Sequence, residues 1–184
     1  KTRPLRHGGR TRAAMRIGIA LGSNLDDRLA LLRSARKRIQ SFHEDSGPFL
    51  CSRIYETAPA DCPPGSPLFL NAALEMSSSL PPLDLLAELQ RIEREFGRPH
   101  DHGFHTPRTI DLDILYCDNL AFRLADLELP HPRIFERPFV LFPLIDICPD
   151  RILPRKSISI RQHCDLIHAT GLSSQDLPKP LHHF

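Results

Sequence analysis

The sequence has no tryptophan, only two tyrosines and two methionines, and no apolar run long enough to cross a bilayer. A membrane-spanning helix needs about 20 consecutive apolar residues, so we expect no membrane segment and no membrane partner. None of the five cysteines forms a C-x-x-C pair, and their number is odd. This usage fits reduced thiols rather than a disulfide or zinc framework, and we therefore expect a cytoplasmic protein.

A strong excess of charge of one sign is also missing. The 24 basic residues are nearly offset by 22 acidic ones, and the formal net charge of +2 carries no strong message about partners. The 41% hydrophobic and 25% charged residues are ordinary for a globular protein. A chain of 184 residues suits one domain that buries roughly two thirds of the surface of its unfolded form, so stabilising disulfides are not required.

The two ends of the chain differ from the middle in composition. Residues 1–14 are rich in arginine and contain no acidic residue, so we expect a disordered basic extension there. An organelle transit peptide is the alternative, although the segment has no serine and no apolar core. Residues 15–170 are expected to form a single domain, and residues 171–184 a polar tail.

The spacing of apolar residues predicts six main elements. Alternation predicts strands over residues 16–21, 49–57, 70–76 and 109–116. Helical spacing predicts one helix over residues 25–42, with Asn24 or Asp26 as its N-cap, and a second over 82–96 that ends at Gly97. The order strand, helix, strand, strand, helix, strand is typical of a split β-α-β arrangement. We predict the α+β class, with a ferredoxin-like antiparallel sheet and helices packed on it.

Residues 117–184 show weaker patterns. A short strand is expected around residues 127–129. Prolines at 130, 132, 138 and 143 then limit the chain to short helical turns, because proline removes a backbone donor. Residues 157–169 fit one more amphipathic helix.

Two carboxylates lie two residues apart on the last strand of the predicted sheet. Alternate residues share a face, so Asp111 and Asp113 point one way while the residues at 110, 112, 114 and 116, Tyr116 among them, face the core. Two carboxylates about 6 to 7 Å apart at Cα repel each other unless a cation lies between them, and hard oxygen ligands suit Mg²⁺. A strand with a wet, charged face is the alternative, and the spacing alone does not decide.

Arginines accompany this carboxylate pair along the chain: Arg98, Arg108, Arg133 and Arg137. Guanidinium groups bind phosphate oxygens in a bidentate manner, and phosphoryl transfer is catalysed mainly by positioning and charge neutralisation. Metal ions with arginines are therefore the equipment expected for that reaction. Each arginine taken alone could equally be a solvated surface residue.

Six segments, in the right order and spacing, resemble the hydroxymethyldihydropterin pyrophosphokinase family. They are L-G-S-N at 21–24, Y-E-T at 55–57, F-L-N-A-A at 69–73, R-I-E to G-R at 91–98, P-R-T-I-D-L-D at 107–113 and P-H-P-R to R-P-F-V-L at 130–141. The resemblance covers about residues 15–150. It implies that ATP donates a pyrophosphoryl group to the 6-hydroxymethyl oxygen of a dihydropterin, giving AMP and the pterin diphosphate of folate synthesis.

The resemblance also implies roles for individual residues. Asp111 and Asp113 would hold two Mg²⁺ ions that bridge the phosphates of ATP, and together with Arg98 and Arg108 they would be the catalytic residues. For ATP binding it implies Gln90, Glu93, Arg98, Arg108, Ile114, His131 and Arg137. A pterin ring needs aromatic faces and directed amides, and for this the resemblance implies Thr57, Ala58, Phe69, Asn71, Asp111 and Phe139.

The segment at 100–106 departs most from the family pattern. His100 stands where an arginine is common, and His105 where a tryptophan is frequent. Because an unperturbed histidine titrates near ~6.5, ATP affinity is predicted to depend on pH if His100 replaces a permanent cation. A transition-metal site formed by His100, His102 and His105, or a plain solvated loop, are alternatives.

Two other functions fit parts of the sequence. A nucleotide- or pterin-binding module without turnover would keep the fold, but the metal carboxylates argue against it. An RNA-binding ferredoxin-like domain would need an aromatic-rich central strand, which the sequence lacks. We therefore expect ATP and hydroxymethyldihydropterin as substrates, no nucleic-acid partner, and a monomer.

Overall fold

The computed structural model describes residues 13–59, 63–97, 108–169 and 178–184. Within these residues a six-stranded sheet forms the centre of the molecule, in the order β5-β1-β4-β3-β8, with β2 also paired to β4. Every pairing in this sheet is antiparallel. Its strands are β1 Met15–Ser23, β2 Leu50–Cys51, β3 Arg53–Thr57, β4 Phe69–Ser78, β5 Asp111–Cys117 and β8 Lys179–His183.

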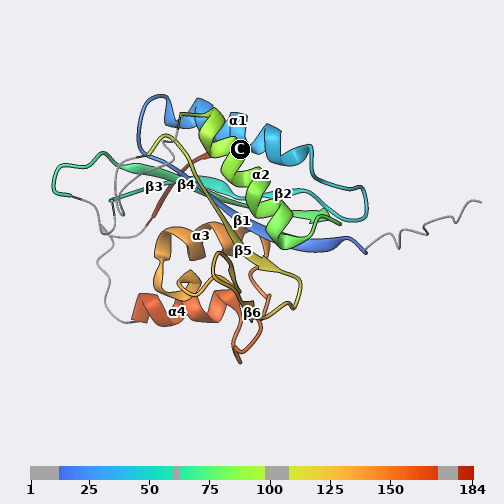
Figure 1. The fold of residues 1–184 in the computed structure, drawn as a ribbon. Helices are drawn as coiled ribbons and strands as arrows, with labels where there is room; N and C mark the ends of the chain where they lie inside the picture. The colour runs from blue at the N-terminus through green and yellow to red at the C-terminus, as the bar shows by residue number, and fades with distance from the viewer. Residues whose placement is uncertain (1–12, 60–62, 98–107, 170–177) are drawn as a thin grey trace, which may run out of the picture.

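Helices cover both faces of the sheet (Figure 1). Helices α1 (Arg28–Gln40) and α2 (Pro82–Glu95) lie on one face, and α3 (Pro138–Ile147) and α4 (Ile160–Ala169) lie on the other. Helix α1 leads from β1 toward β3, and β4 lies between these two strands in the sheet. Helix α2 connects β4 to β5, and β1 lies between those two. The predicted α+β class, with an antiparallel sheet and packed helices, is confirmed.

Strand β1 separates two hydrophobic cores because its alternate residues point to opposite faces. Ile17, Ile19 and Leu21 are buried under α1 and α2 together with Leu85, Leu89 and Ile92. The other face of β1 carries Gly18, Ala20 and Gly22, against which the second core and a pocket are built. Because these residues are small, bulky and polar side chains from β4 and β5 can lie close to the backbone of β1.

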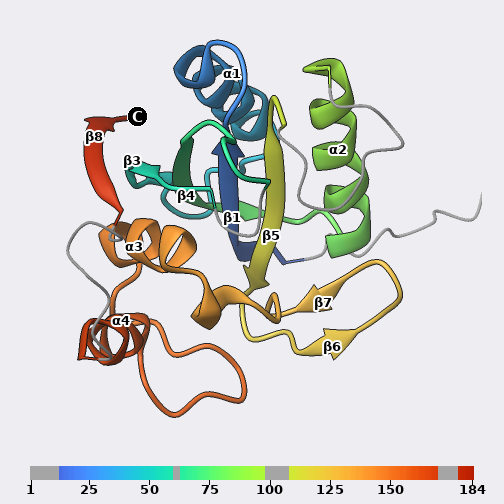
Figure 2. The same ribbon diagram turned by 90° about the vertical axis from the view of Figure 1, so that its left-hand side faces the viewer.

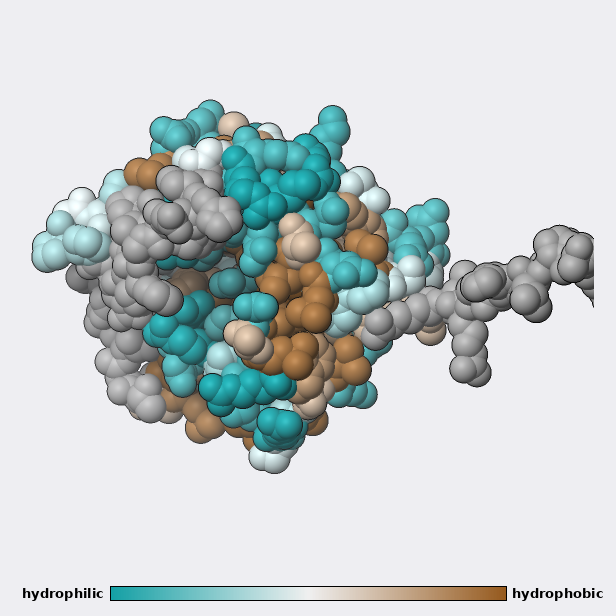
Figure 3. Space-filling view, in the orientation of Figure 1, coloured by the Kyte–Doolittle hydropathy of each residue, from teal (hydrophilic) through white to brown (hydrophobic). Residues whose placement is uncertain are grey.

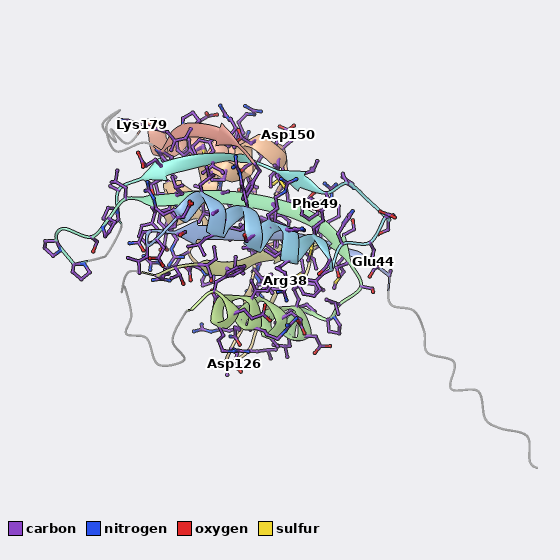
Figure 4. The ribbon with its side chains drawn as sticks, turned by 90° about the horizontal axis from the view of Figure 1, so that it is seen from above. Arg38, Glu44, Phe49, Asp126, Asp150 and Lys179 are labelled. Carbon is purple, nitrogen blue, oxygen red and sulfur yellow. The ribbon has the colours of Figure 1, made fainter. Side chains whose placement is uncertain are left out.

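Helix α2 follows its predicted pattern. Leu85, Leu89 and Ile92 are fully buried, and Gly97 has a φ of 86°, which is the left-handed conformation expected where the helix ends. Seen from above, α2 lies at the β5 side of the sheet while α1 lies over its middle (Figure 4). This position brings the last turns of α2 to the edge of β5.

Helix α1 differs from the prediction at its start. Its N-cap is Asp27, whose side chain accepts a hydrogen bond from the Ala30 N–H at 3.0 Å, rather than Asn24 or Asp26. Asp26 instead adopts a φ of 57° in the turn before the helix. The expected strand over residues 49–57 is interrupted at Ser52, whose hydroxyl accepts the Ala73 N–H at 2.9 Å in place of a backbone carbonyl.

Tyr116 is buried as predicted, but it lies on the face of the sheet opposite to the one that alternation predicts. A shift of register between β1 and β5 lies next to Gly18, and after it Tyr116 pairs with Gly18 and packs into the core under α3, on the same face as the two aspartates. Its ring occupies the position where a Cβ on Gly18 would stand. Strict alternation places Tyr116 on the opposite face, because it does not allow for a β-bulge.

Three further segments of the chain extend or replace the weaker expectations. Residues Phe122–Arg123 (β6) and Glu128–Leu129 (β7) pair as a small hairpin (Figure 2), and a 3-10 turn (η1) follows at Ile134–Glu136. Helix α3 runs for 10 residues with Pro143 inside it, longer than the short turns expected there. Strand β8 pairs with β3 within the segment for which a polar tail was expected.

The face of the molecule that is seen in the orientation of Figure 1 carries both hydrophilic and hydrophobic residues (Figure 3). Hydrophilic residues cover the upper helices, and hydrophobic residues gather below α2, in the part of the view where Figure 1 draws β5 and the β6–β7 hairpin. Among the described helices, none combines the length and apolar character that a bilayer crossing requires.

Candidate functional site

A pocket opens on the α3 side of the sheet, where the end of β1 meets the first residues of β4 and β5. The end of β3 and the first turn of α3 complete its walls. It encloses about 710 Å³ of space, a figure that includes space open to solvent. All six residues for which the family resemblance implies pterin binding line this pocket: Thr57, Ala58, Phe69, Asn71, Asp111 and Phe139.

The register of the sheet brings these residues together. Gly22 of β1 pairs with Asn71 of β4 on one side and with Asp111 of β5 on the other. One step along the same face, Ala20 pairs with Ala73 and with Asp113. The floor of the pocket is therefore made of small β1 residues, with an amide on one side and two carboxylates on the other.

Asn71 is held in one orientation. Its side chain is 6% exposed, and its Nδ2 donates a hydrogen bond to the Thr57 Oγ1 at 2.7 Å. A Cβ added to Gly22 would lie 2.9 Å from the Asn71 Oδ1, so glycine is needed at position 22 for the amide to lie where it does. A buried amide that is fixed in this way presents a directed donor and acceptor to a ligand.

Each aspartate has an arginine beside it. The Arg108 Nη1 lies 2.8 Å from the Asp111 Oδ2, and the Arg137 Nη1 lies 3.7 Å from the Asp113 Oδ2. Burial lowers the pKa of Arg137, and the nearby Asp113 partly opposes this effect. Two negative and two positive groups thus line one side of the pocket, a charge pattern suited to anionic oxygens that arrive with cations.

The pocket also has aromatic walls. Phe69 comes from the start of β4 and Phe139 from the first turn of α3, and both rings line the cavity. The Arg137 guanidinium lies 5.7 Å from the centroid of the Phe139 ring, which connects the aromatic part to the charged part. A flat ring with a phosphate-bearing partner beside it would find both kinds of contact in this one cavity.

His131 lies near the charged side of the pocket. Its backbone N–H donates to the Leu115 carbonyl at 2.8 Å, and its Nδ1 accepts the Arg133 N–H at 3.1 Å. Burial, together with the positive charges of Arg137 and Arg133, lowers the pKa of His131 to about 4. The ring is therefore neutral at pH 7 and carries its proton on Nε2.

Glu93 contacts the sheet itself. Its carboxylate, 7% exposed, accepts the backbone N–H of Leu112 at 2.8 Å, midway between the two aspartates on the edge strand β5. Gln90, one turn earlier on α2, is exposed. The family resemblance implies ATP binding for both residues, and for Glu93 the structure adds a contact that holds β5.

Not every residue implied by the resemblance lines the cavity. Gln90, Glu93, Ile114 and His131 are not among the lining residues, and the Ile114 side chain is buried in the core under α1 and α2. Arg98 lies outside the described residues, as do His100, His102 and His105. The roles of these residues stay predictions.

The chemistry of the donor set fits Mg²⁺. Within the described part of the chain no group of three or more His, Cys, Asp or Glu side chains could hold a metal by itself. Two carboxylates are nevertheless sufficient for Mg²⁺, which commonly takes one or two and completes its shell with water and substrate phosphates. Asp111 and Asp113 line the pocket with their neighbouring arginines, so a phosphate-bound cation could reach them.

Sequence reasoning missed two features of the site. It gave no role to Gly22 and Ala20, whose lack of bulk makes the floor. It considered Asn24 only as a helix cap, whereas this side chain is 2% exposed and bonds to two other segments. A signal was present in Gly22 of the L-G-S-N segment, because a glycine inside a strand often marks a site where a ligand or another backbone approaches closely.

The fold and the pocket define a class of protein in which two aromatic rings and a buried amide share one cavity with a cluster of carboxylates and arginines. Residues 18–149 match the family described as 7,8-dihydro-6-hydroxymethylpterin-pyrophosphokinase. Over 132 residues, which are 71% of this chain and 76% of the relative, the sequence is 42% identical to the 2-amino-4-hydroxy-6-hydroxymethyldihydropteridine pyrophosphokinase of Bacillus subtilis. The chain belongs to this pyrophosphokinase family.

Other relatives are much longer proteins. The chain is 44% identical over 133 residues to the mitochondrial folate synthesis bifunctional protein of Pisum sativum, a match that covers 71% of this chain and 25% of the relative. It spans only 24% to 32% of the length of three of the curated relatives it matches. The crystal structure of wild-type Plasmodium falciparum HPPK-DHPS with pterin and p-hydroxybenzoate has a TM-score of 0.68 at 13% identity, covering 94% of this chain and 47% of that one. That likeness supports the fold.

Proposed function

We propose that the protein transfers the pyrophosphoryl group of ATP to the 6-hydroxymethyl oxygen of 6-hydroxymethyl-7,8-dihydropterin. The hydroxyl oxygen forms a bond to the β-phosphorus, and the bond between that phosphorus and the oxygen bridging to the α-phosphate breaks. AMP leaves with the bonding electron pair, and the hydroxyl proton passes to solvent. The products are AMP and the pterin diphosphate used in folate synthesis.

One observation carries this proposal: a single pocket joins the amide and the two phenylalanines to the paired carboxylates and arginines. The pterin ring would lie between Phe69 and Phe139, with its polar edge read by the Asn71 amide. Thr57 holds that amide in place through the 2.7 Å hydrogen bond between the Thr57 Oγ1 and the Asn71 Nδ2. The hydroxymethyl group would then point toward Asp111.

The phosphate end of the reaction falls to the charged residues. Arg108 and Arg137 would release their aspartate partners to contact phosphate oxygens, since guanidinium binds phosphate as well as carboxylate. Asp111 and Asp113 would then hold Mg²⁺, which when bound neutralises charge on the phosphates and orients them for in-line attack. The neutral His131, with the proton on its Nε2, would donate a hydrogen bond near the same phosphates.

We further propose that the sheet is ferredoxin-like. The order β5-β1-β4-β3 and the two helices that each cross over an inserted antiparallel strand support this description. Strand β8 and the α3–α4 layer would be additions to that core.

Location and assembly stay predictions. We propose a reducing compartment, such as the cytoplasm, and a monomeric state. No disulfide joins the cysteines in the described ranges, and burial raises the pKa of the Cys148 thiol to about 11 and of the Cys164 thiol to about 12, so both stay protonated. Size-exclusion chromatography with light scattering would test the monomer, and a dimer mass would contradict it.

The reaction is tested by incubating the purified protein with ATP, Mg²⁺ and 6-hydroxymethyl-7,8-dihydropterin and separating the nucleotides. AMP formed in equal amount to the pterin diphosphate is the expected result. ADP as the product, or no turnover at all, would contradict the proposed reaction. A pterin-binding module without turnover would bind the pterin in the same experiment and leave ATP intact.

A further inference from the structure

Asn24 is a buried polar residue between strand β1 and helix α1. It is 2% exposed, and its side-chain Oδ1 accepts the backbone N–H of Arg108 at 2.8 Å. Its own backbone N–H donates to the Arg108 carbonyl at 3.2 Å. These two bonds tie the backbone of Arg108 to the end of β1, just beyond the last paired residues of β1 and β5, Gly22 and Asp111.

The same turn also holds the segment that leads into β4. The Asn24 Nδ2 donates to the Pro67 carbonyl at 3.4 Å, a long hydrogen bond. Arg28, at the first position of α1, donates through Nη1 to the next carbonyl, that of Leu68, at 2.7 Å. Phe69, which follows directly, is a wall of the pocket. The β1–α1 turn therefore contacts both the charged side and the aromatic side of the site.

Asparagine suits this position for a chemical reason. The side chain must accept a hydrogen bond from the Arg108 N–H and donate one to the Pro67 carbonyl at the same time, and a primary amide does both. The amide is not needed as a helix cap, because Asp27 caps α1. A buried amide without partners would cost free energy, so these bonds account for its presence.

We propose that Asn24 is a positioning residue, which fixes the backbone of Arg108 relative to residues 67–68, the segment that leads into β4. The Arg108 backbone, fixed by Asn24, places the guanidinium beside Asp111 at 2.8 Å, which is the charged end of the pocket. The weaker bond to the Pro67 carbonyl restrains the segment before Phe69, and this helps to fix the aromatic wall of the pocket. The kinetic part of this inference rests on the pyrophosphoryl transfer proposed above.

The test compares three variants with the wild type. Asn24→Ala removes both side-chain bonds, and we expect kcat to fall by about 10- to 100-fold, since a displacement of about 1 Å costs up to that much. Asn24→Asp keeps the acceptor for the Arg108 N–H and loses the donor to Pro67, so kcat should stay within about threefold while the KM for the pterin rises. Ser23→Ala is the matched control, because Ser23 is buried in the same turn and its hydroxyl has no hydrogen-bond partner among the described residues.

A double-mutant cycle separates positioning from a general structural effect. If Asn24 acts through the guanidinium, Asn24→Ala should add less than about threefold to the loss caused by Arg108→Ala, because residues that act as a unit are not additive. Additive losses, or equal kcat losses in Asn24→Ala and Asn24→Asp, would overturn the proposal. If Asn24→Ala does not fold, Asn24→Ser takes its place, since a hydroxyl is too short to reach both partners.

Hydrogen exchange gives a readout that needs no activity. In the ligand-free protein, a peptide containing Arg108 should exchange its amide faster in Asn24→Ala than in the wild type, and at the wild-type rate in Asn24→Asp and Ser23→Ala. An unchanged exchange rate in Asn24→Ala would contradict the proposal that Asn24 fixes the Arg108 backbone. If the wild type forms no AMP but the variants show these exchange differences, the proposed function is rejected while the positioning role of Asn24 is retained.

Discussion

The side-chain amide of Asn71 lies against the backbone of Gly22, with its Oδ1 2.9 Å from the position that a Cβ on residue 22 would occupy. The two residues are also partners in the register of β4 and β1. Contact at this distance leaves no room for a methyl group unless the amide moves. The glycine and the amide therefore form one feature, which sets the depth and the polar edge of the pocket.

Gly22→Ala should weaken pterin binding because the new methyl group displaces the Asn71 amide. Overpacking of this kind costs about 1–3 kcal/mol, so we expect the KM for the pterin to rise by about tenfold or more. The KM for ATP should change much less. Steady-state kinetics with each substrate varied in turn measures both constants.

Gly18→Ala is the contrasting variant for that experiment. Its Cβ would meet the Tyr116 ring in the second core, away from the pocket. We expect a lower Tm with an unchanged KM for the pterin. If the two glycine variants raised this KM equally, the specific role of Gly22 would be refuted.

Asp111→Asn and Asp113→Asn should each reduce kcat by about 100- to 1,000-fold, the scale seen when one stabilising group is removed from a transition state. Both side chains are partly exposed, at 25% and 39%, so the variants should remain folded. Asp126→Asn removes an exposed carboxylate between β6 and β7, outside the residues that line the pocket, and serves as the control (Figure 4). Circular dichroism and the AMP assay check both statements, and full activity in both site variants would remove the metal assignment.

Stability should decrease as the pH falls from about 6.5 toward 4, in part because of His131. Burial lowers the pKa of His131 to about 4 in the folded protein, below its ordinary value of 6.5. Between these values the unfolded chain binds the proton that the folded protein excludes, so protonation favours unfolding. Urea unfolding at pH 7.5, 6 and 5 measures the slope. His131→Asn should flatten it, and an identical slope in the variant would contradict the assignment.

A pH dependence of the KM for ATP near 6.5 would point to a different histidine. His131 is already neutral in that range, whereas the family resemblance implies that an arginine is common at the position of His100. If His100 replaces that cation, the KM for ATP should rise between pH 6 and pH 8 as the imidazole loses its charge. The His100→Arg variant should show a flat profile. A profile that is the same in both proteins would reject the role of His100.

The buried carboxylate of Glu75 should matter for stability and not for the reaction. It accepts hydrogen bonds from the Tyr116 hydroxyl at 2.8 Å and from the Arg151 Nη2 at 3.0 Å, and it pairs with Arg16. Glu75→Ala leaves these partners without their acceptor and should cost about 3–5 kcal/mol of unfolding free energy. At a temperature where the variant is folded, kcat should be within about twofold of the wild type. A large loss of kcat would connect this cluster to the site.

The sequence was informative where a local pattern and burial agreed. Helix α2 was predicted from the spacing of Leu85, Leu89 and Ile92, because a periodic apolar face is a local property that the tertiary structure then buries. The face of Asp111 and Asp113 was predicted for the same reason, since alternation along a strand needs no knowledge of neighbouring strands. Tyr116, three residues after Asp113, was placed on the wrong face because a β-bulge depends on the partner strand.

The candidate site was harder to predict from the sequence. Motif order identified Asn71 and the two aspartates as residues of one site, but it did not show that Gly22 lies between them or that Asn24 reaches Arg108 across 84 positions of the chain. Such contacts depend on which strands become neighbours. Strand β8 was missed for a similar reason, because an edge strand of five residues is stabilised by its pairing with β3 rather than by its own pattern.

The sequence by itself determined the class of fold, the alternation that puts two carboxylates on one face of a strand, and the family. These follow from local periodicity and from residue types at fixed spacing. Only the tertiary structure decided how Gly22 brings Asn71 and Asp111 to the two sides of one pocket, and how Arg108 is held there. The physical reason is that close approach between strands is set by the register of the whole sheet, which no single segment of the chain encodes.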